Sequence, residues 1–394
     1  MIYKFGEFQL DQNRHELRRG DQTIAIEPQV YDLIHLIVSK QGELVTRDEM
    51  IEVVWGGRIV SESAISARIA SARKALGDDG KAQRIIQTVS RRGLRLNMPV
   101  AVAGEADASG SEPVIEAKKP PVRFARADDG TQIAYMDAGQ GRAVFLVSHF
   151  PSNIEAEWSN DLDGRTLQEL ASHHRLILMD FRDSGQTDGP FPEDPWSTIA
   201  ADMKAVLDHL EIEKTDLYGQ SSGAASALIF AHTYPERVGK IILQGGYAQG
   251  RMARLGKGAG TETISLMVQE GWDTPGSSFI SSYLSAYVPD ATPAQIDALA
   301  EIVQSSATVE TALKMRDLGN RLDILHLLPD IPHPTLVIHS RGETVHPPSE
   351  AKKLAKNLPN ASLAIFDSRN HYILQTEECW PEFIDTVLTF LASD

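Results

Sequence analysis

Apolar positions in the first hundred residues change from strand-like to helix-like spacing. The expected strands cover residues 2–10, 15–18 and 22–26. Helical spacing follows over residues 28–40, 46–55 and about 61–76. Thr46 begins the second helix, and Glu49 three residues later completes a capping pattern. Residues 85–96 alternate again around a turn that holds Arg91 and Arg92, so we expect a sheet, three helices and a hairpin.

After residue 122, apolar strands alternate with helical segments. The expected strands lie at residues 123–127, 132–137, 144–147, 176–179, 216–218, 240–243, 335–338 and 363–366. This alternation predicts a mostly parallel sheet covered by helices. Residues 251–323 interrupt it with amphipathic helical segments, which we expect to form a cap over a pocket.

Residues 99–121 are rich in Ala, Gly, Ser, Glu and Pro, and they predict a linker between a domain at 1–98 and one at 122–394. The net charge of −16 is divided unevenly between these domains. The first 98 residues hold 15 Lys and Arg against 13 Asp and Glu, and the remainder holds 23 against 41. This asymmetry indicates that only the first domain contacts phosphate groups.

The third expected helix contains Ala-Ile-Ser-Ala-Arg-Ile-Ala-Ser-Ala-Arg-Lys-Ala-Leu-Gly-Asp-Asp, and the hairpin contains Ile-Gln-Thr-Val-Ser-Arg-Arg-Gly-Leu-Arg-Leu. These residues resemble the winged helix-turn-helix output domain of OmpR-type response regulators over residues 1–98. The resemblance implies that double-stranded DNA is a partner, with Ser63, Ser66 and Arg68 facing the major groove and Arg91 and Arg92 on the wing. The alternative is a solvated basic helix. The sequence holds no receiver domain, so we expect the input signal to come from the second domain.

Gly219-Gln220-Ser221-Ser222-Gly223 lies between an expected strand and an expected helix, which is the setting of a nucleophilic serine held on a tight turn. Such a serine needs a base and an acid from later in the chain. His371 follows the last expected strand, and Glu343 follows the strand before it. The order serine, acid, histidine resembles that of the α/β-hydrolase fold over about residues 122–392.

The resemblance implies an oxyanion hole made by the N–H groups of Ser222 and Phe150. Relatives commonly carry His-Gly-Phe-Pro in the loop where this chain has Ser-His-Phe-Pro, so His149 replaces a glycine. His149 either contacts a ligand or is an ordinary loop histidine. Glu343 is one methylene longer than the commoner aspartate. Both departures favour slow or vestigial hydrolysis, and we expect no metal and no cofactor.

Two functions remain open. In the first, the protein is a DNA-binding transcription regulator whose hydrolase-fold domain senses a small carbonyl-containing ligand. In the second, it is a serine hydrolase (an esterase, lactonase or amidase) with an attached DNA-binding domain. The sequence has neither a signal-peptide pattern nor an apolar run near the ~18 residues that a membrane helix needs, so we expect a cytoplasmic protein without a membrane partner. A single winged helix makes few base contacts, so we expect a homodimer on two half-sites.

Overall fold

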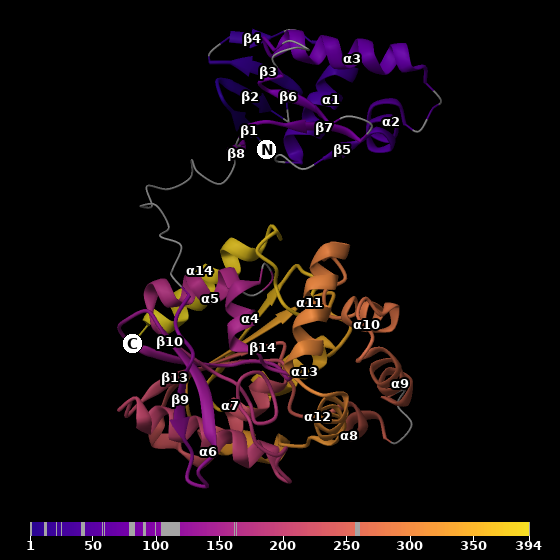
Figure 1. Cartoon of the computed structure of the whole chain (residues 1–394). Helices are drawn as coiled ribbons and strands as arrows, with labels where there is room; N and C mark the ends of the chain where they lie inside the picture. Colours follow the sequence, from indigo (N-terminus) through magenta and orange to yellow (C-terminus); the bar gives the residue numbers. More distant parts are fainter. Residues whose placement is uncertain are drawn as a thin grey trace. The chain divides into compact units, whose positions relative to one another are not determined.

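The computed structural model of the chain divides into two compact units, Met1–Val114 and Ile115–Asp394 (Figure 1). The division falls inside the stretch 99–121 that the sequence predicts as a linker. The structure describes residues 2–11, 14–20, 22–24, 26–40, 44–56, 58, 60–78, 83–89, 92–98, 100–103, 119–160, 162, 164–256 and 261–393.

The N-terminal unit contains two small antiparallel sheets and three helices. The first sheet has the order β4-β3-β2-β1-β8 and consists of β1 (Ile2–Phe5), β2 (Phe8–Asp11), β3 (Glu16–Arg19), β4 (Gln22–Ile24) and β8 (Val100–Ala103). The second sheet consists of β5 (Val45–Thr46), β7 (Gly93–Leu96) and β6 (Ile86–Val89). The helices are α1 (Pro28–Ser39), α2 (Arg47–Trp55) and α3 (Glu62–Ala75). Sheet, helices and hairpin follow one another in the order that the sequence predicts.

The strand β8 corrects the predicted start of the linker. Its residues pair antiparallel with β1, from Ala103 opposite Ile2 to Val100 opposite Phe5. Val100 and Val102 have high strand propensity, and β8 covers an edge of β1 that would otherwise expose unpaired N–H and C=O groups. The N-terminal domain therefore extends at least to Ala103 rather than ending at residue 98.

Local sequence signals fix the helices of this unit. Thr46 Oγ1 accepts from the Glu49 N–H at 3.3 Å, and the Glu49 carboxylate accepts from the Thr46 N–H at 2.7 Å, so the predicted capping pattern of α2 is present. Ser61 caps α3 in the same way, since its hydroxyl accepts from the Ala64 N–H at 3.3 Å. Ile65 and Ala72 are buried on the inner face of α3. The opposite face of this helix is therefore exposed.

The C-terminal unit is built on an eight-stranded sheet with the order β16-β15-β14-β13-β11-β12-β10-β9. Its strands are β9 (Arg123–Arg126), β10 (Gln132–Ala138), β11 (Ala143–Val147), β12 (Arg175–Met179), β13 (Thr215–Gln220), β14 (Val238–Gln244), β15 (Thr335–Ser340) and β16 (Ala361–Phe366). The strands β11 to β16 pair with one another in parallel, and β10 pairs antiparallel with β12 and with β9. The carboxyl ends of the parallel strands meet at one edge, where ligands bind in sheets of this kind.

Helices cover both faces of this sheet (Figure 1). One apolar cluster contains residues of α6 (Pro195–His209), α7 (Ser222–Thr233) and α13 (Pro348–Asn357). The other contains residues of α4 (Ile154–Ser159), α5 (Gly164–His173) and α14 (Trp380–Ala392). Two short 3-10 helices precede strands of the sheet: η1 (Pro235–Arg237) lies before β14, and η2 (Leu325–Asp330) lies before β15. Because both faces are buried, the central strands are almost continuously apolar.

The stretch that interrupts the strand-helix alternation is helical. It contains α8 (Arg251–Leu255), α9 (Thr261–Gly271), α10 (Ser278–Leu284), α11 (Pro293–Ser306) and α12 (Val309–Arg321). Part of it has an apolar cluster of its own, with Val268, Trp272, Ile280 and Leu299 among the buried residues. In the described part of the chain, every helix is too short or too polar to cross a membrane.

Candidate active site

Ser221 lies at the turn between β13 and α7. Its backbone has φ 52° and ψ −117°, a conformation that residues other than glycine rarely adopt. The Ser221 N–H donates to the Gln244 carbonyl at 2.9 Å, which ties the turn to β14. The side chain is 6% exposed and lines a cavity. This is the strained strand-to-helix turn on which a nucleophilic serine is presented.

The two glycines that flank the turn are required by close packing. A Cβ atom on Gly219 would lie 2.5 Å from the Ala224 Cα, and one on Gly223 would lie 2.1 Å from the Val147 carbonyl oxygen. Both contacts are with backbone atoms, which cannot move away without displacing β11 or α7. Glycine therefore allows α7 to begin directly against the central strands.

His371 and Glu343 form a buried pair in the loops that follow β16 and β15. His371 Nδ1 lies 2.6 Å from Glu343 Oε1, and both side chains are fully buried. In a neutral imidazole with this contact, Nδ1 donates to the carboxylate oxygen and Nε2 is the acceptor. Nε2 has no hydrogen-bond partner among the described residues. A histidine in this state can take a proton from a serine hydroxyl.

Additional contacts hold the longer side chain of Glu343 in place. The His346 N–H donates to Glu343 Oε1 at 2.9 Å, and His339 Nε2 lies 3.2 Å from Glu343 Oε2. The same His339 nitrogen hydrogen-bonds the His346 carbonyl at 3.1 Å, which requires that Nε2 carries the hydrogen. Burial lowers the pKa of His339, so a neutral ring faces the carboxylate. The turn from residue 339 to 346 thus accommodates a glutamate where aspartate is commoner.

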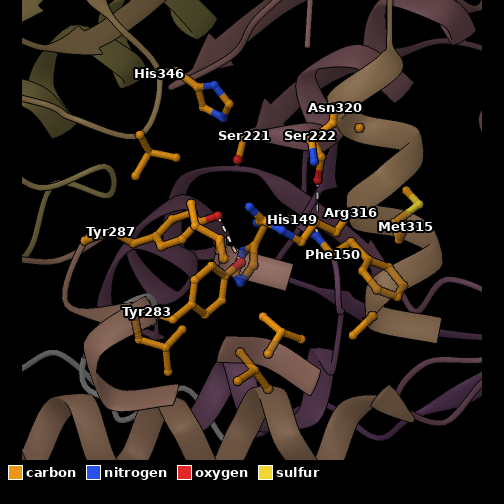
Figure 2. A pocket seen from close by; sticks show the side chains of 18 of the residues that line it. His149, Phe150, Ser221, Ser222, Tyr283, Tyr287, Met315, Arg316, Asn320 and His346 are labelled. Carbon is orange, nitrogen blue, oxygen red and sulfur yellow. Dashed lines mark hydrogen bonds between the residues drawn. The ribbon is translucent and has the colours of Figure 1, made fainter. Parts of the chain in front are cut away.

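The predicted oxyanion-hole residues lie together, but one of their donors is engaged. The Phe150 N–H donates to Ser222 Oγ at 3.2 Å, so the hydroxyl next to the candidate nucleophile occupies this donor. Figure 2 shows this hydrogen bond beside Ser221. An incoming carbonyl oxygen has to compete with the Ser222 hydroxyl for the Phe150 N–H.

His149 lines the cavity and packs against Tyr372 in a tilted arrangement. Its ring centroid lies 5.0 Å from that of Tyr372. Burial, and next the proximity of His371, lowers the pKa of His149 to about 4, so the ring is neutral at pH 7. A neutral imidazole on a cavity wall can donate or accept one hydrogen bond to a ligand.

The cavity has a volume of about 220 Å³ and lies between the strand ends and the helices α8–α12. Figure 2 shows Ser221, Ser222, His149 and Phe150 grouped with side chains from these helices. Aromatic and charged residues of the cavity wall include Tyr247, Arg251, Arg254, Trp272, Tyr283, Tyr287, Arg316 and His346. The backbone N–H of His371 donates to the carbonyl of Tyr287, a residue of the cavity wall, at 2.6 Å.

In the N-terminal unit, the side chains predicted to contact DNA differ in exposure and in partners, and the Ser63 hydroxyl hydrogen-bonds that of Ser61 at 2.9 Å. Ser63 and Ser66 are exposed on α3. Arg68 is partly buried instead, with Nε donating to Gln29 Oε1 at 3.0 Å and Nη1 paired with Glu27. That Arg68 faces a DNA groove stays a prediction, and in this structure side chains before and at the start of α1 bind its guanidinium.

The hairpin carries one described arginine of the predicted wing pair. Arg92 is exposed in the turn between β6 and β7, and Arg91 lies outside the described residues. Arg73 of α3 donates to the Ile86 carbonyl at 3.0 Å and to Thr88 Oγ1 at 2.8 Å. Arg73 thus joins the helix to the hairpin.

A family sequence model described as "alpha/beta hydrolase fold" matches residues 150–377, which is more than half of the chain. The chain belongs to the α/β-hydrolase family. A second model, described as "Transcriptional regulatory protein, C terminal", matches residues 21–96. The protein therefore joins a winged-helix domain of the transcriptional regulator type to an α/β-hydrolase domain.

The curated relatives and solved structures match the hydrolase domain. A 2-hydroxy-6-oxononadienedioate/2-hydroxy-6-oxononatrienedioate hydrolase of Paraburkholderia xenovorans is 30% identical over 287 residues, which are 69% of this chain and 94% of that protein. A hydrolase of the same name from Burkholderia vietnamiensis is 31% identical over 261 residues, with 62% and 87% covered. A bromoperoxidase of Bacillus anthracis superposes with a TM-score of 0.60 at 21% identity, covering 69% of this chain and all of that one, which shows a shared fold.

Sequence reasoning missed several residues of the hydrolase site. His339 and His346 carried a weak signal, since both lie within four residues of Glu343 in a loop where a triad acid is expected. Arg251, Arg254 and Arg316 lie in the expected cap, and their spacing alone does not reveal that they line one cavity with Ser221. Only the packing of α8 and α12 onto the strand ends brings them together.

Proposed function

We propose that this protein is a transcription regulator that binds DNA through its winged-helix domain and senses a small carbonyl-containing ligand in its hydrolase domain. The observation that carries the proposal is the joining, in one chain, of a regulator-type winged helix to a cavity that contains Ser221. Binding at that cavity would favour one arrangement of the DNA-binding domains over another.

The DNA-binding half of the proposal is supported by the exposed face of α3 and by the hairpin. Ser63 and Ser66 are exposed and would contact base edges or phosphates in the major groove. The Ser63 hydroxyl also hydrogen-bonds that of Ser61 at 2.9 Å. Arg92 is exposed on the wing and suited to phosphate contact. Arg68, held by Glu27 and Gln29, would orient α3 or reach DNA only after exchanging these partners.

The ligand-sensing half is supported by the chemistry of the cavity. A serine on a strained turn beside backbone donors suits a polarised carbonyl carbon and its oxygen. The curated relatives named above are hydrolases of 6-oxo dioates, and this agrees with a carbonyl-containing ligand. Competition by the Ser222 hydroxyl for the Phe150 N–H favours slow turnover, which suits a receptor because a fast enzyme would destroy its own signal.

The second candidate function is serine hydrolysis of an ester, lactone or amide. It is favoured by the buried His371–Glu343 pair at 2.6 Å and by His371 Nε2, which has no hydrogen-bond partner among the described residues. In that case Ser221 Oγ attacks the carbonyl carbon while His371 takes its proton, and His371 passes this proton to the leaving oxygen or nitrogen as its bond to the carbonyl carbon breaks. Water then hydrolyses the acyl-serine with His371 as base, and Glu343 orients the imidazole. The attached winged helix would then control expression or place the enzyme near DNA.

One pair of measurements tests the regulator against the enzyme. An operator is selected from genomic DNA with the purified full chain, and its dissociation constant is measured at fixed salt before and after a fluorophosphonate is attached to Ser221. For a coupling of about 1–3 kcal/mol, the regulator predicts a change of about five- to 150-fold. Ser221→Ala, which cannot be labelled, controls for direct effects of the reagent.

An unchanged operator affinity in the labelled protein, together with rapid multiple turnover of simple esters, would support the enzyme and contradict the regulator.

The proposal also includes a homodimer on two half-sites, acting in the cytoplasm where chromosomal DNA lies. Light scattering of the protein with and without operator DNA tests the dimer. A monomer in both conditions would remove this part of the proposal.

A further inference from the structure

The cavity of the hydrolase domain carries positive charge within a strongly acidic chain. Among the described residues that line it are Arg251, Arg254 and Arg316, and none of those lining residues is Asp or Glu. The whole chain has a formal net charge of −16. A group of cations on the wall of a cavity in such a chain indicates an anionic ligand.

The three arginines lie on two helices that pack against each other. Arg251 and Arg254 are three residues apart on α8 and therefore share a face, and Arg316 lies on α12. The Arg316 guanidinium carbon lies 5.6 Å from the ring centroid of Tyr283. Figure 2 shows Arg316 in the same group of side chains as Ser221 and His149. A cation–π contact holds the guanidinium without neutralising its charge.

Buried nitrogens of these arginines lack acceptors. Arg251 Nε, Arg254 Nη1 and Arg316 Nε have no hydrogen-bond partner among the described residues. Glu350 Oε2 lies 3.8 Å from Arg254 Nη1, which is too far for a hydrogen bond, and Glu350 Oε1 accepts from Lys353 at 2.7 Å. Within the described part of the chain, Arg251 and Arg316 form no ion pair. Arg254 is ion-paired with Glu350, whereas Arg251 and Arg316 are partly buried cations without such a partner among the described residues. Leaving these charges unpaired is costly, so oxygen atoms of a ligand would stabilise this arrangement.

Two histidines and two tyrosines of the cavity wall add no charge near pH 7. Burial lowers the pKa of His149 to about 4 and that of His346 well below its ordinary value. Burial also raises the pKa of Tyr247 to about 12 and that of Tyr287 well above its ordinary value. The positive charge therefore comes from guanidinium groups, whose planar fork matches a carboxylate.

We propose that Arg251, Arg254 and Arg316 form a subsite for the carboxylate of the ligand, so that the sensed molecule is an acidic carbonyl compound. The inference rests on the proposed function and specifies its ligand class. The carboxylate would contact α8 and α12, and the carbonyl carbon would lie at Ser221. One molecule would then connect the helices of residues 251–321 to the strand ends.

Calorimetry on the full chain tests the subsite without any readout of DNA binding or turnover. Succinate, glutarate and adipate are compared with their dimethyl esters, which have a similar shape and no charge. We expect at least one dicarboxylate to bind and its ester to bind about tenfold or more weakly. Arg316→Gln should weaken dicarboxylate binding by about ten- to hundredfold. Arg321→Gln is the matched control, because Arg321 lies on α12 but is exposed and paired with Asp317.

Failure of all three dicarboxylates to bind, or equal binding of acid and ester, overturns the subsite. If Arg316→Gln unfolds, as judged by circular dichroism, the affinities of the dicarboxylates and their esters for the unaltered protein still test the subsite. Equal losses of dicarboxylate affinity in Arg316→Gln and Arg321→Gln also overturn the subsite. A dicarboxylate that binds as expected but leaves operator affinity unchanged would uphold the subsite and contradict ligand sensing, so the two failures are distinct.

Discussion

The hydrogen bond between Phe150 and Ser222 makes a quantitative prediction about the reactivity of Ser221. In Ser222→Ala, the Phe150 N–H is released to bind the oxygen of an incoming electrophile. The 3.2 Å separation is at the long end of the ordinary range for N–H···O bonds. Such a neutral bond is worth about 0.5–1.5 kcal/mol net, so its removal should raise the rate at which Ser221 reacts by about two- to tenfold.

The assay is the second-order rate constant for labelling of Ser221 by a fluorophosphonate. Ser226→Ala, one turn further along α7, is the matched control, because the buried Ser226 hydroxyl has no partner among the described residues. An unchanged rate in Ser222→Ala would show that the hydroxyl does not compete for the donor. A fall of about 10²–10³ would show the reverse of our reasoning, namely that the hydroxyl is itself an oxyanion donor.

Other predictions concern stability, pH and DNA. Gly245 has φ +61°, and a Cβ there would lie 2.7 Å from His371 Cε1. Gly245→Ala should therefore cost about 1–2 kcal/mol of stability through backbone strain and slow the labelling of Ser221. An unchanged melting temperature would contradict this prediction. With a folded-state pKa of about 4 against 6.5, His149 contributes stability above pH 6.5 that is lost as the pH falls toward 4. The melting temperature of the unaltered protein relative to His149→Gln should therefore be lower at pH 4.5 than at pH 7, and a constant difference would refute the shift. Arg92→Ala should reduce the slope of log binding constant against log salt by about one without relaxing site choice, and an unchanged slope would remove Arg92 from the DNA contacts.

The element order of both domains follows from local pattern, and so does the tight turn at Ser221. Strand-helix alternation predicts the parallel sheet, and the glycines around Ser221 predict a tight turn whose positive φ the structure shows. His371 and Glu343 were predicted from their places after consecutive strands, because parallel strands end at one edge. Their 2.6 Å contact follows from that topology. Their role in catalysis stays a prediction.

Contacts between segments far apart in sequence could not be predicted in this way. The ion pair of Arg68 with Glu27 spans 41 residues, and periodicity shows only which face of α3 is polar. The same applies to the cavity arginines, whose helices are placed by packing on the strand ends. The strand β8 was missed because its composition resembles a linker, and its structure depends on an available edge of β1.

The close approach at Gly223 has an evolutionary consequence. Since a side chain there would collide with the Val147 carbonyl oxygen, selection for a well-packed sheet would keep this glycine even in a lineage that no longer uses the serine. The two glycines are therefore required by the packing of the turn, and the chemistry of the turn depends on the side chain at position 221. Replacement of Ser221 with both glycines kept would leave this packing in place and remove the candidate nucleophile.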